Sequence, residues 1–364
     1  MAQFSVITGG SELSDYTHSM AKTGLTLDKL DLLVPEGKTW SICIGAGCSL
    51  PIFPTWGDLA QEILQSTCGV TQKMAYTISQ YLSPDIIIQS AYDKSQLEAA
   101  KFAEHLSSSL YHKILDNLSY LDKKEIIKCL SSTHPDPNRK WTKFIKVVTQ
   151  YGEPSAMQVA RIITEAYVKN KGLESILSFN AEVLLSSLVN AIMQIEHKHN
   201  TKILDYITEP TSSHYKGRIS YIFCHGSVAI PESSRVAQKQ FNSLDKLVFS
   251  ENEYLQLANS AYSWQSSRFI NTLTTNTVFF VGLSFKDPNI RRWLAWIHEC
   301  RKQAINKFNN QHDCTAHYWI EKAPNDEGVK TWIESSVAHL GIRMIWISDW
   351  NEIEQVFRKA IKLY

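Results

Sequence analysis

Residues of the types that bind a nucleotide follow a short apolar run near the start of this sequence. Gly45, Ala46 and Gly47 come directly after that run, and Ser49 follows them. A tight turn from a strand into a helix lets glycines admit a ligand closely, and a helix N-terminus offers N–H groups to a phosphate. The segment therefore predicts a nucleotide site. The pattern is incomplete, because the dinucleotide fingerprint has a third glycine or alanine where this chain has Leu50, and such glycines also occur simply as turns.

The loop after this turn combines prolines with an aromatic residue. The segment LPIFPTWGDL, residues 50–59, places Thr55 and Trp56 after its second proline and Asp58 where a helix could start. A rigid loop with an aromatic side chain could cover a nucleotide site. A lone tryptophan more often fills the core, so both interpretations of Trp56 stay open here.

Three further apolar runs end in polar residues. Ligands of open α/β sheets bind at the carboxyl ends of strands, so the convergence of several such ends is more informative than any one of them. Taken singly, an asparagine after a strand usually caps the next helix, and a single histidine is more often structural than catalytic. The polar residues at these ends are Asn180 and Glu182, His225 and Gly226, and Gly282, Ser284 and Asp287.

The elements that must position these residues alternate along the chain. Short apolar runs predict buried strands, and helical patterns separate most of them. This alternation indicates a Rossmann-like, doubly wound and mostly parallel α/β sheet. Ser250 with Glu253 forms a capping box, and Asp287 before Pro288 supplies an N-cap. The predicted strands cover residues 40–44, 175–179, 219–224, 246–250, 277–283, 316–321 and 342–347, and the helices 181–198, 251–273, 288–308, 326–340 and 351–363.

One long segment interrupts the alternation. Residues 68–171 contain helical patterns and turn-rich stretches but no convincing strand, which predicts a helical insertion. We interpret residues 38–364 as one nucleotide-binding domain that carries this insertion. Residues 1–37 are polar with a weak apolar pattern, and we expect them to form an N-terminal extension.

Composition and charge narrow the class of protein. The net charge of +1 gives no field that would attract nucleic acid or an anionic membrane, so we expect neither as a partner. No segment has the apolar length of a membrane span or the form of a signal peptide, so we expect a cytoplasmic protein. The seven cysteines form no CxxC pair, which supports neither a disulfide framework nor a zinc ribbon, and we expect no metal.

The order of the motifs resembles the sirtuin superfamily, and most closely the zinc-free sirtuin-like domains of bacterial anti-phage systems. The series is GAGCS, then Pro-Thr-Trp, then Asn with an acid two residues later, then His-Gly, then Gly-x-Ser. The segments DKLVFSENEY (245–254) and GLSFKDPNIRRWL (282–294) also resemble that subgroup. The resemblance covers the chain from Trp40 to about Trp350.

The resemblance implies that NAD is the substrate and gives each motif a role. Asn180 would contact the nicotinamide ribose or position a water, and His225 would be the general base on a ribose hydroxyl or on that water. Cleavage of the nicotinamide glycosidic bond needs held ribose oxygens and a group that titrates near neutral pH, which agrees with these roles. The residues expected to bind NAD are Gly45, Ala46, Gly47 and Ser49 around the diphosphate and adjacent ribose, Thr55 and Trp56 in the loop that shields the nicotinamide end, Gly282 and Ser284 at the adenosine half, and Glu182, Gly226 and Asp287.

The sequence departs from the family pattern at three points. The four zinc-binding cysteines of sirtuin deacylases are absent, so protein deacylation loses support. Phe179 stands where the family usually has Gln or Thr before the asparagine, which removes a polar contact. Glu182 stands where Asp is usual and keeps the charge with one more methylene.

These features predict an NAD+ glycohydrolase that releases nicotinamide and ADP-ribose. By resemblance it would deplete NAD in an infected cell and so stop phage replication, in an abortive infection. We expect control through homo-oligomerisation or through a separate subunit, such as a HerA-like ATPase or a nucleotide-processing protein. Two alternatives remain: an NAD-dependent deacylase or ADP-ribosyltransferase, and a regulatory subunit that binds NAD or ADP-ribose without catalysis.

Overall fold

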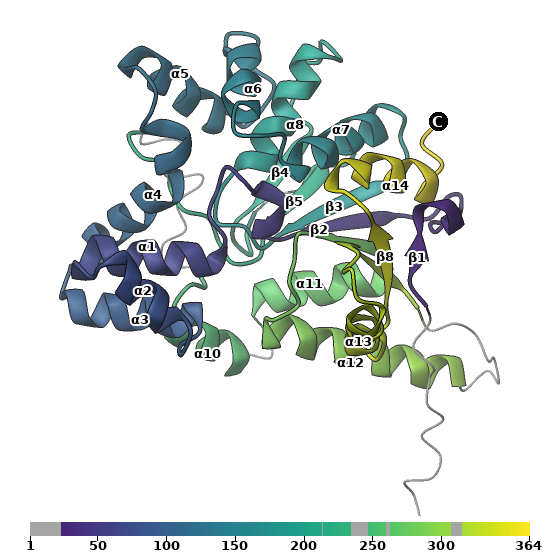
Figure 1. The fold of residues 1–364 in the computed structure, drawn as a ribbon. Coiled ribbons are helices and arrows are strands. Elements are labelled where there is room, and N and C mark those ends of the chain that lie inside the picture. Colours follow the sequence, from purple (N-terminus) through teal and green to yellow (C-terminus); the bar gives the residue numbers. More distant parts are fainter. Residues whose placement is uncertain (1–22, 213, 234–246, 260–262, 307–314) are drawn as a thin grey trace, which may run out of the picture.

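The computed structural model contains one sheet of eight parallel strands with helices on both faces (Figure 1). The strand order is β1-β8-β7-β6-β2-β3-β5-β4, and every neighbouring pair is parallel. This is a doubly wound sheet, so the predicted Rossmann-like α/β class is confirmed. The structure describes residues 23–212, 214–233, 247–259, 263–306 and 315–364.

The strands are mostly apolar runs, as expected where helices cover both faces of a parallel sheet. All five residues of β2 are buried, and β2 pairs with β3 on one side and with β6 on the other. Six of the predicted runs are strands, and their ends match the prediction or differ from it by one or two residues, whereas the patterns do not predict β1 and β4. The strands are β1 Leu25–Thr26, β2 Trp40–Ile44, β3 Leu173–Ser178, β4 Leu204–Ile207, β5 Ile219–Phe223, β6 Thr277–Val281, β7 His317–Lys322 and β8 Ile342–Ile347.

The strand predicted over residues 246–250 is wrong for the part that the structure describes. Residues 247–249 have no regular secondary structure, although Leu247, Val248 and Phe249 are all buried. The backbone N–H of Val248 donates to the carbonyl of His225 at 3.0 Å. This segment is therefore apolar because it packs against the end of β5, and it adds no strand to the sheet.

Two layers of helices cover the sheet. In Figure 1, α7, α8 and α14 lie on one face, and α11, α12 and α13 lie on the other. The predicted N-cap Asp287 accepts bonds from the backbone N–H groups of Asn289 and Ile290, and the predicted capping residue Glu253 accepts one from the backbone N–H of Ser250. The helices are α7 Ser155–Val168, α8 Leu184–Ile195, α10 Glu251–Asn259, α11 Trp264–Thr275, α12 Pro288–Asn306, α13 Glu327–Ala338 and α14 Ile353–Ala360.

The chain between β2 and β3 is helical, as predicted for residues 68–171. Its first helices form a lobe beside the carboxyl edge of the sheet, on the left of Figure 1. Asp58 lies in the third position of the first of these helices rather than at its start, and Thr55 is the N-cap. The helices are α1 Trp56–Cys68, α2 Gln72–Ser79, α3 Pro84–Ser95, α4 Ala99–Leu115, α5 Tyr120–Leu130 and α6 Trp141–Thr149, and α7 completes the connection.

The described part of the expected N-terminal extension contributes to the sheet. Leu25 and Thr26 form β1, which pairs in parallel with β8 at the edge of the sheet. The backbone N–H of Gly24 donates to the carboxylate of Glu334 on α13 at 2.8 Å. Residues 23–26 are therefore attached to the domain, and residues 1–22 lie outside the described part.

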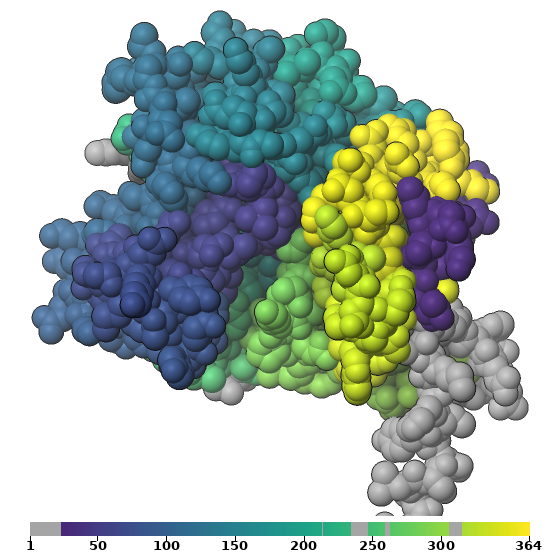
Figure 2. Space-filling model, viewed as in Figure 1, coloured from purple at the N-terminus to yellow at the C-terminus, as the bar shows by residue number. Residues whose placement is uncertain are grey.

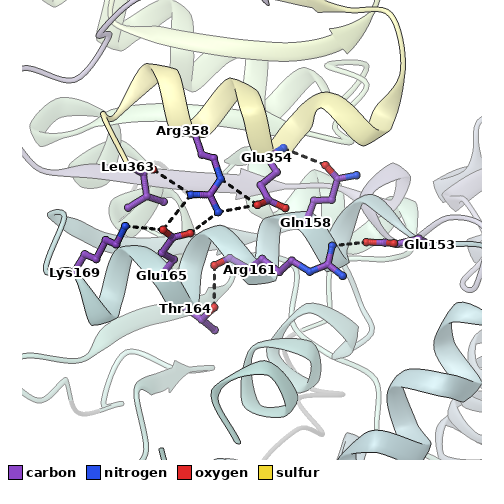
Figure 3. Close-up of polar contacts among 9 residues, drawn as sticks. All are labelled: Glu153, Gln158, Arg161, Thr164, Glu165, Lys169, Glu354, Arg358 and Leu363. Carbon is purple, nitrogen blue, oxygen red and sulfur yellow. Dashed lines mark hydrogen bonds and ion pairs between the residues drawn. The ribbon is translucent and has the colours of Figure 1, made fainter. Parts of the chain in front are cut away.

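Arg358 of the last helix, α14, bonds that helix to the neighbouring helix α7 (Figure 3). Arg358 of α14 donates to both carboxylate oxygens of Glu165 on α7, at 3.0 and 2.6 Å. The same guanidinium bonds Glu354 one turn earlier and the carbonyl of Leu363 beyond the helix. Such bidentate arginine–carboxylate pairs fix geometry as well as contributing energy. This set of bonds, the Arg358 clamp, therefore joins the C-terminal end of the chain to the helical layer that covers β2 and β3.

Candidate functional site

The carboxyl ends of four neighbouring strands bring the predicted site residues to one edge of the sheet. The strands β6, β2, β3 and β5 are consecutive in the sheet and all run in the same direction. Asn180 and His225 each come two residues after the end of β3 and β5, which are paired. The backbone N–H of Val228 donates to the carbonyl of Ala181 at 2.8 Å, so the loops that carry both residues are bonded to each other.

Asn180 is held in one orientation by its neighbours. Its Nδ2 donates to Ser49 Oγ at 3.1 Å and to Glu182 Oε1 at 2.8 Å. Its Oδ1 is buried and has no hydrogen-bond partner among the described residues. Because a carboxylate oxygen can only accept, the amide nitrogen must face Glu182. The carbonyl oxygen of Asn180 is therefore the atom left available to a donor such as a hydroxyl or a water.

Glu182 is the centre of this buried network. Its carboxylate accepts the Ser49 hydroxyl at 2.6 Å, the Asn180 amide, and the backbone N–H of Leu184. Burial raises the pKa of Glu182, because the charged form loses its hydration, and these hydrogen bonds oppose that shift. Ser49 and Glu182 thus contact each other and Asn180, and both are buried. Their predicted contacts with NAD stay predictions.

His225 is buried between polar groups and aromatic rings. Its Nδ1 lies 3.4 Å from the hydroxyl of Tyr254, and its Nε2 lies 3.6 Å from Oδ2 of Asp287. Burial lowers the pKa of His225, and the Asp287 carboxylate acts in the opposite direction. The imidazole is therefore neutral at neutral pH, which is the state that can accept a proton.

Phe179 forms an apolar wall against the imidazole. Its ring meets the ring of His225 edge to face, with centroids 4.7 Å apart, and also packs on Phe269 of α11 at 5.8 Å. The family's usual Gln or Thr at this position would place a polar group against the histidine. Phenylalanine instead covers one side of the ring with apolar surface, which contributes to the burial that lowers the pKa of His225.

The glycines of the predicted phosphate turn have a packing function in this structure. The N–H of Gly45 donates to the carbonyl of Val281, and that of Gly47 to the carbonyl of Gly282, each at 3.0 Å. A Cβ on Gly45 would lie 2.5 Å from the Gly282 carbonyl oxygen. The turn therefore needs glycine because the loops after β2 and β6 touch through their backbones. A diphosphate bound here would have to find other N–H groups, and this predicted role is untested.

The loop after the glycine turn leads into α1 and carries an aromatic residue that packs on another segment. Thr55 and Asp58 form a reciprocal capping box at the beginning of α1. Trp56 is half-buried, and its ring lies 4.4 Å from the ring of Phe249 in the segment that bonds to the backbone of His225. Trp56 is thus neither a free lid nor a deep core residue, since it packs on the segment that covers the end of β5.

The remaining predicted residues lie at the ends of β5 and β6. Gly226 and Gly282 have left-handed backbones, with φ of 78° and 66°, which a non-glycine residue rarely adopts. Ser284 is exposed, whereas Asp287 is half-buried and caps α12. Figure 2 shows the surface hollowed between the blue and purple lobe that contains α1 and the green α11. The hollow lies beside the edge at which β2 and β6 end.

A second hollow lies outside this cluster of residues. It has a volume of about 570 Å³ and lies at the carboxyl ends of β1, β7 and β8, with Lys330, Trp346 and Lys359 among its lining residues. The predicted site residues do not line it, so the polar cluster at β3 and β5, rather than this hollow, is the candidate site. In the described ranges no group of three or more His, Cys, Asp or Glu could hold a metal ion. None of the helices described is long and apolar enough to cross a bilayer.

A comparison with protein families supports a sirtuin-like α/β domain. The SIR2-like domain family matches residues 186–345, from α8 to β8, which include His225, Tyr254 and Asp287. This part of the chain is therefore similar to SIR2-like domains, and the likeness inferred from the sequence motifs is confirmed. The match begins after Asn180, so it does not cover the glycine turn or the asparagine.

A curated relative is similar over part of the chain. The NAD(+) hydrolase ThsA of Enterococcus faecium is 21% identical over 220 aligned residues, and the alignment covers 56% of this chain. The alignment covers 44% of that protein, so the similarity spans less than half of its length.

The structure adds one polar residue to the candidate site. Tyr254 contacts His225, but the sequence offers only its place in a segment that resembles the subgroup. The sequence does contain a signal for the position of Tyr254. The capping pair Ser250 and Glu253 fixes the start of α10, and Tyr254 is the next residue, so it lies in the first turn of a helix that begins beside β5.

Proposed function

We propose that this chain hydrolyses NAD+ to nicotinamide and ADP-ribose. The observation that carries the proposal is a pair of buried polar atoms at neighbouring strand ends, Oδ1 of Asn180 and Nε2 of His225, which have no hydrogen-bond partner among the described residues. Buried polar atoms are nearly always satisfied in native proteins, so such a pair supports a ligand position. The SIR2-like match and the distant relative named as an NAD(+) hydrolase support the same chemistry.

The two side chains suit the two needs of this reaction. The bond between the ribose C1′ and the nicotinamide nitrogen breaks, and its electron pair leaves with nicotinamide. Oδ1 of Asn180 accepts a hydrogen bond from a ribose hydroxyl or from the attacking water. As the water oxygen bonds to C1′, the neutral imidazole of His225 takes the proton that the water loses. The apolar ring of Phe179 keeps bulk water away from the imidazole during this step.

The rest of the substrate would extend along the same edge of the sheet. Trp56 and Phe249 pack together beside the segment that covers His225, which suits the nicotinamide end. The loop of Gly282 and Ser284 follows β6, two strands away from β3 in the sheet, which suits the adenosine half. This placement keeps the predicted order of the motifs along an extended dinucleotide.

In this proposal the enzyme serves anti-phage defence, and its activity is controlled by assembly. Unrestrained NAD hydrolysis would kill the cell, so the chain needs a trigger from self-association or from a partner subunit. The expected behaviour is low activity of the dilute protein and a steep rise on assembly. Activity that is full and independent of protein concentration, without a partner, would contradict this part.

The test is product analysis with variants of the two central residues. Purified protein, alone and together with the products of neighbouring genes, is incubated with etheno-NAD, and nicotinamide and ADP-ribose are measured by chromatography. Asn180→Ala and His225→Ala should each lower the rate about a hundredfold or more. Two exposed residues of the same types, Asn325 and His339, provide alanine variants as controls that keep full activity.

Two outcomes would replace the proposal. If the wild-type protein binds NAD by calorimetry but releases no nicotinamide, alone or assembled, the chain is a binding subunit. If mass spectrometry shows ADP-ribose on a protein, or an acyl group removed from a lysine peptide, the chain is a transferase or deacylase.

A further inference from the structure

His225 has one polar neighbour at each ring nitrogen. The Tyr254 hydroxyl lies 3.4 Å from Nδ1 and the Asp287 carboxylate lies 3.6 Å from Nε2. The tyrosine comes from the first turn of α10 and the aspartate from the residue before α12. Two separate segments thus converge on the imidazole of His225. The ring of Tyr254 also meets the ring of His225 edge to face, with centroids 5.4 Å apart.

The Asp287 carboxylate is fixed, and its two oxygens have different surroundings. Oδ1 accepts the backbone N–H groups of Asn289 at 2.7 Å and Ile290 at 3.3 Å, as an N-cap does. Oδ2 is buried without a hydrogen-bond partner among the described residues, and it is the atom that faces His225. A helix cap needs only the first oxygen. The second oxygen is therefore held beside the imidazole at the cost of its own hydration.

We infer that Asp287 is a positioning residue that stabilises the protonated imidazole of His225 during catalysis, while Tyr254 holds the ring at its other nitrogen. The inference rests on the proposed function, in which His225 takes a proton from the attacking water. When the neutral ring becomes an imidazolium, Oδ2 of Asp287 becomes its counter-ion without any movement of the chain. His225 is then a general base whose ring is oriented, and whose positive charge is balanced, by the carboxylate of Asp287.

Among the described residues, two titratable groups face the two nitrogens of the ring. Asp287 faces Nε2, Tyr254 faces Nδ1, and Asp85 of α3 acts on Tyr254 rather than on the histidine. The other contact on this side is the apolar ring of Phe179. Burial and the Asp287 carboxylate hold the pKa of Tyr254 well above its usual range, so its hydroxyl stays protonated. The Tyr254 oxygen can accept the Nδ1–H of His225, which leaves Nε2 unprotonated as the atom that takes the proton and then faces Asp287.

The test replaces the carboxylate and keeps the cap. Asp287→Asn retains an oxygen for the N-cap and removes the negative charge. We expect a loss of kcat of about tenfold or more with a smaller change in KM. The acid limb of the kcat profile should move to lower pH, because the carboxylate raises the pKa of His225. Tyr254→Phe should lower kcat less and leave the cap intact.

A matched control separates positioning from helix capping. Asp326 is the N-cap of α13 and accepts the N–H groups of Gly328 and Val329, at 2.7 and 3.1 Å. Asp326→Asn should change neither kcat nor the pH profile. If both aspartate variants lower activity equally, with no shift of the acid limb in either, the role of Asp287 is structural and the inference is overturned.

A second measurement does not depend on NAD hydrolysis. In protein with labelled histidines, NMR titration follows the imidazole of His225 in the wild type and in Asp287→Asn without substrate. A downward shift of the His225 titration in the variant supports the inference even if no nicotinamide is ever released, which would refute the proposed function alone. An unchanged titration overturns the inference even if the wild type hydrolyses NAD.

Discussion

The Nδ2 of Asn180 donates to Oε1 of Glu182 at 2.8 Å, and this bond decides which end of the Asn180 amide remains free. Replacing Glu182 by Gln gives the network one acceptor oxygen and one NH2 group in place of two acceptors. The donors of Asn180, Ser49 and the backbone of Leu184 can no longer all be satisfied. We expect nicotinamide release to fall about tenfold or more and the free energy of unfolding to fall by about 1–3 kcal/mol.

A second buried glutamate provides the control for this variant. Glu334 on α13 accepts the Trp346 indole N–H at 2.7 Å and the Gly24 N–H, both on a single oxygen. Glu334→Gln keeps one oxygen that can accept from both Trp346 and Gly24, and position 334 lies beside the other half of the sheet. The rate of nicotinamide release by this variant should therefore match that of the wild type. Steady-state rates and urea unfolding of both variants make the comparison. Equal kcat for Glu182→Gln and wild type would show that the orientation of Asn180 does not matter.

Gly282 is expected to be intolerant of any side chain. Its φ is 66°, and a Cβ there would overlap the backbone nitrogen of Cys48 in the turn after β2. The positive φ of Gly282 and the nitrogen of Cys48 both belong to the backbone, so moving a side chain can relieve neither the strain nor the clash. Gly282→Ala should therefore destabilise the fold by about 3 kcal/mol or more, measured by denaturant unfolding followed through tryptophan fluorescence.

Gly57 offers the matched alanine substitution for that experiment. It lies in the first turn of α1, and no atom lies within 4 Å of the position that its Cβ would take. Gly57→Ala should be neutral or stabilise the protein by up to about 1 kcal/mol, because alanine has the higher helix propensity. Similar effects of the two variants would mean that the contact between the loops is not tight.

The sequence predicts the centre of the fold better than its edges. The buried runs of β2 and β6 are apolar throughout, and the polar residues after β3 and β5 lie where parallel strand ends must meet. The pattern fails at β4, where Asp205 interrupts the apolar run although it is buried and bonded to the backbone N–H of Tyr215 and the guanidinium of Arg218. Burial of a paired charge has no signal in a single sequence.

The contacts within the candidate site are likewise only partly predictable from the sequence. Residues 247–249 are apolar because they cover a strand end, and a short apolar run that packs this way cannot be told from a strand by periodicity. The contacts of His225 with Tyr254 and Asp287 join segments that are 29 and 62 residues away in the sequence, so they depend on the tertiary fold. The spacing of the glycine turn predicts a contact with a ligand, whereas its contact with Gly282 depends on β2 and β6 being neighbours in the sheet.

Arg358 should contribute measurable stability even though it is partly exposed. It joins Glu165 through two parallel bonds and also bonds Glu354 and the carbonyl of Leu363 (Figure 3). Arg358→Met removes all of these and leaves Glu165 paired with Lys169 alone. After allowance for solvent screening we expect a loss of about 1–2 kcal/mol, because networks with bidentate geometry exceed isolated surface pairs.

Arg161 on the same helix layer provides the comparison. Its guanidinium forms one exposed ion pair, with Glu153 at 2.7 Å. Arg161→Met should change the free energy of unfolding by less than about 0.5 kcal/mol, as for most surface pairs. Urea unfolding at two salt concentrations measures both variants. A loss for Arg358→Met no greater than that for Arg161→Met would show that the clamp contributes no more than an ordinary surface pair.

Acid should destabilise the protein through His317 in the first position of β7. Its side chain is 1% exposed, and Nδ1 accepts the backbone N–H of Val278 at 3.3 Å, so the folded protein holds a neutral ring. Burial, with Arg301 and His298 nearby, lowers the pKa of His317 to about 3. The unfolded chain takes up this proton below about pH 6.5, whereas the folded chain does not. The contribution of His317 to stability is therefore complete above about pH 6.5 and falls as the pH decreases toward 3, by about 2 kcal/mol between pH 7 and pH 5.

His317→Asn keeps an acceptor for Val278 and cannot titrate. Its free energy of unfolding should therefore depend less steeply on pH than that of the wild type, whatever its stability at pH 7. Guanidinium unfolding of both proteins at several pH values between 5 and 8 measures the two slopes, with the exposed His339→Asn as the control that keeps the wild-type slope. Parallel curves for His317→Asn and wild type would place the acid sensitivity elsewhere in the fold.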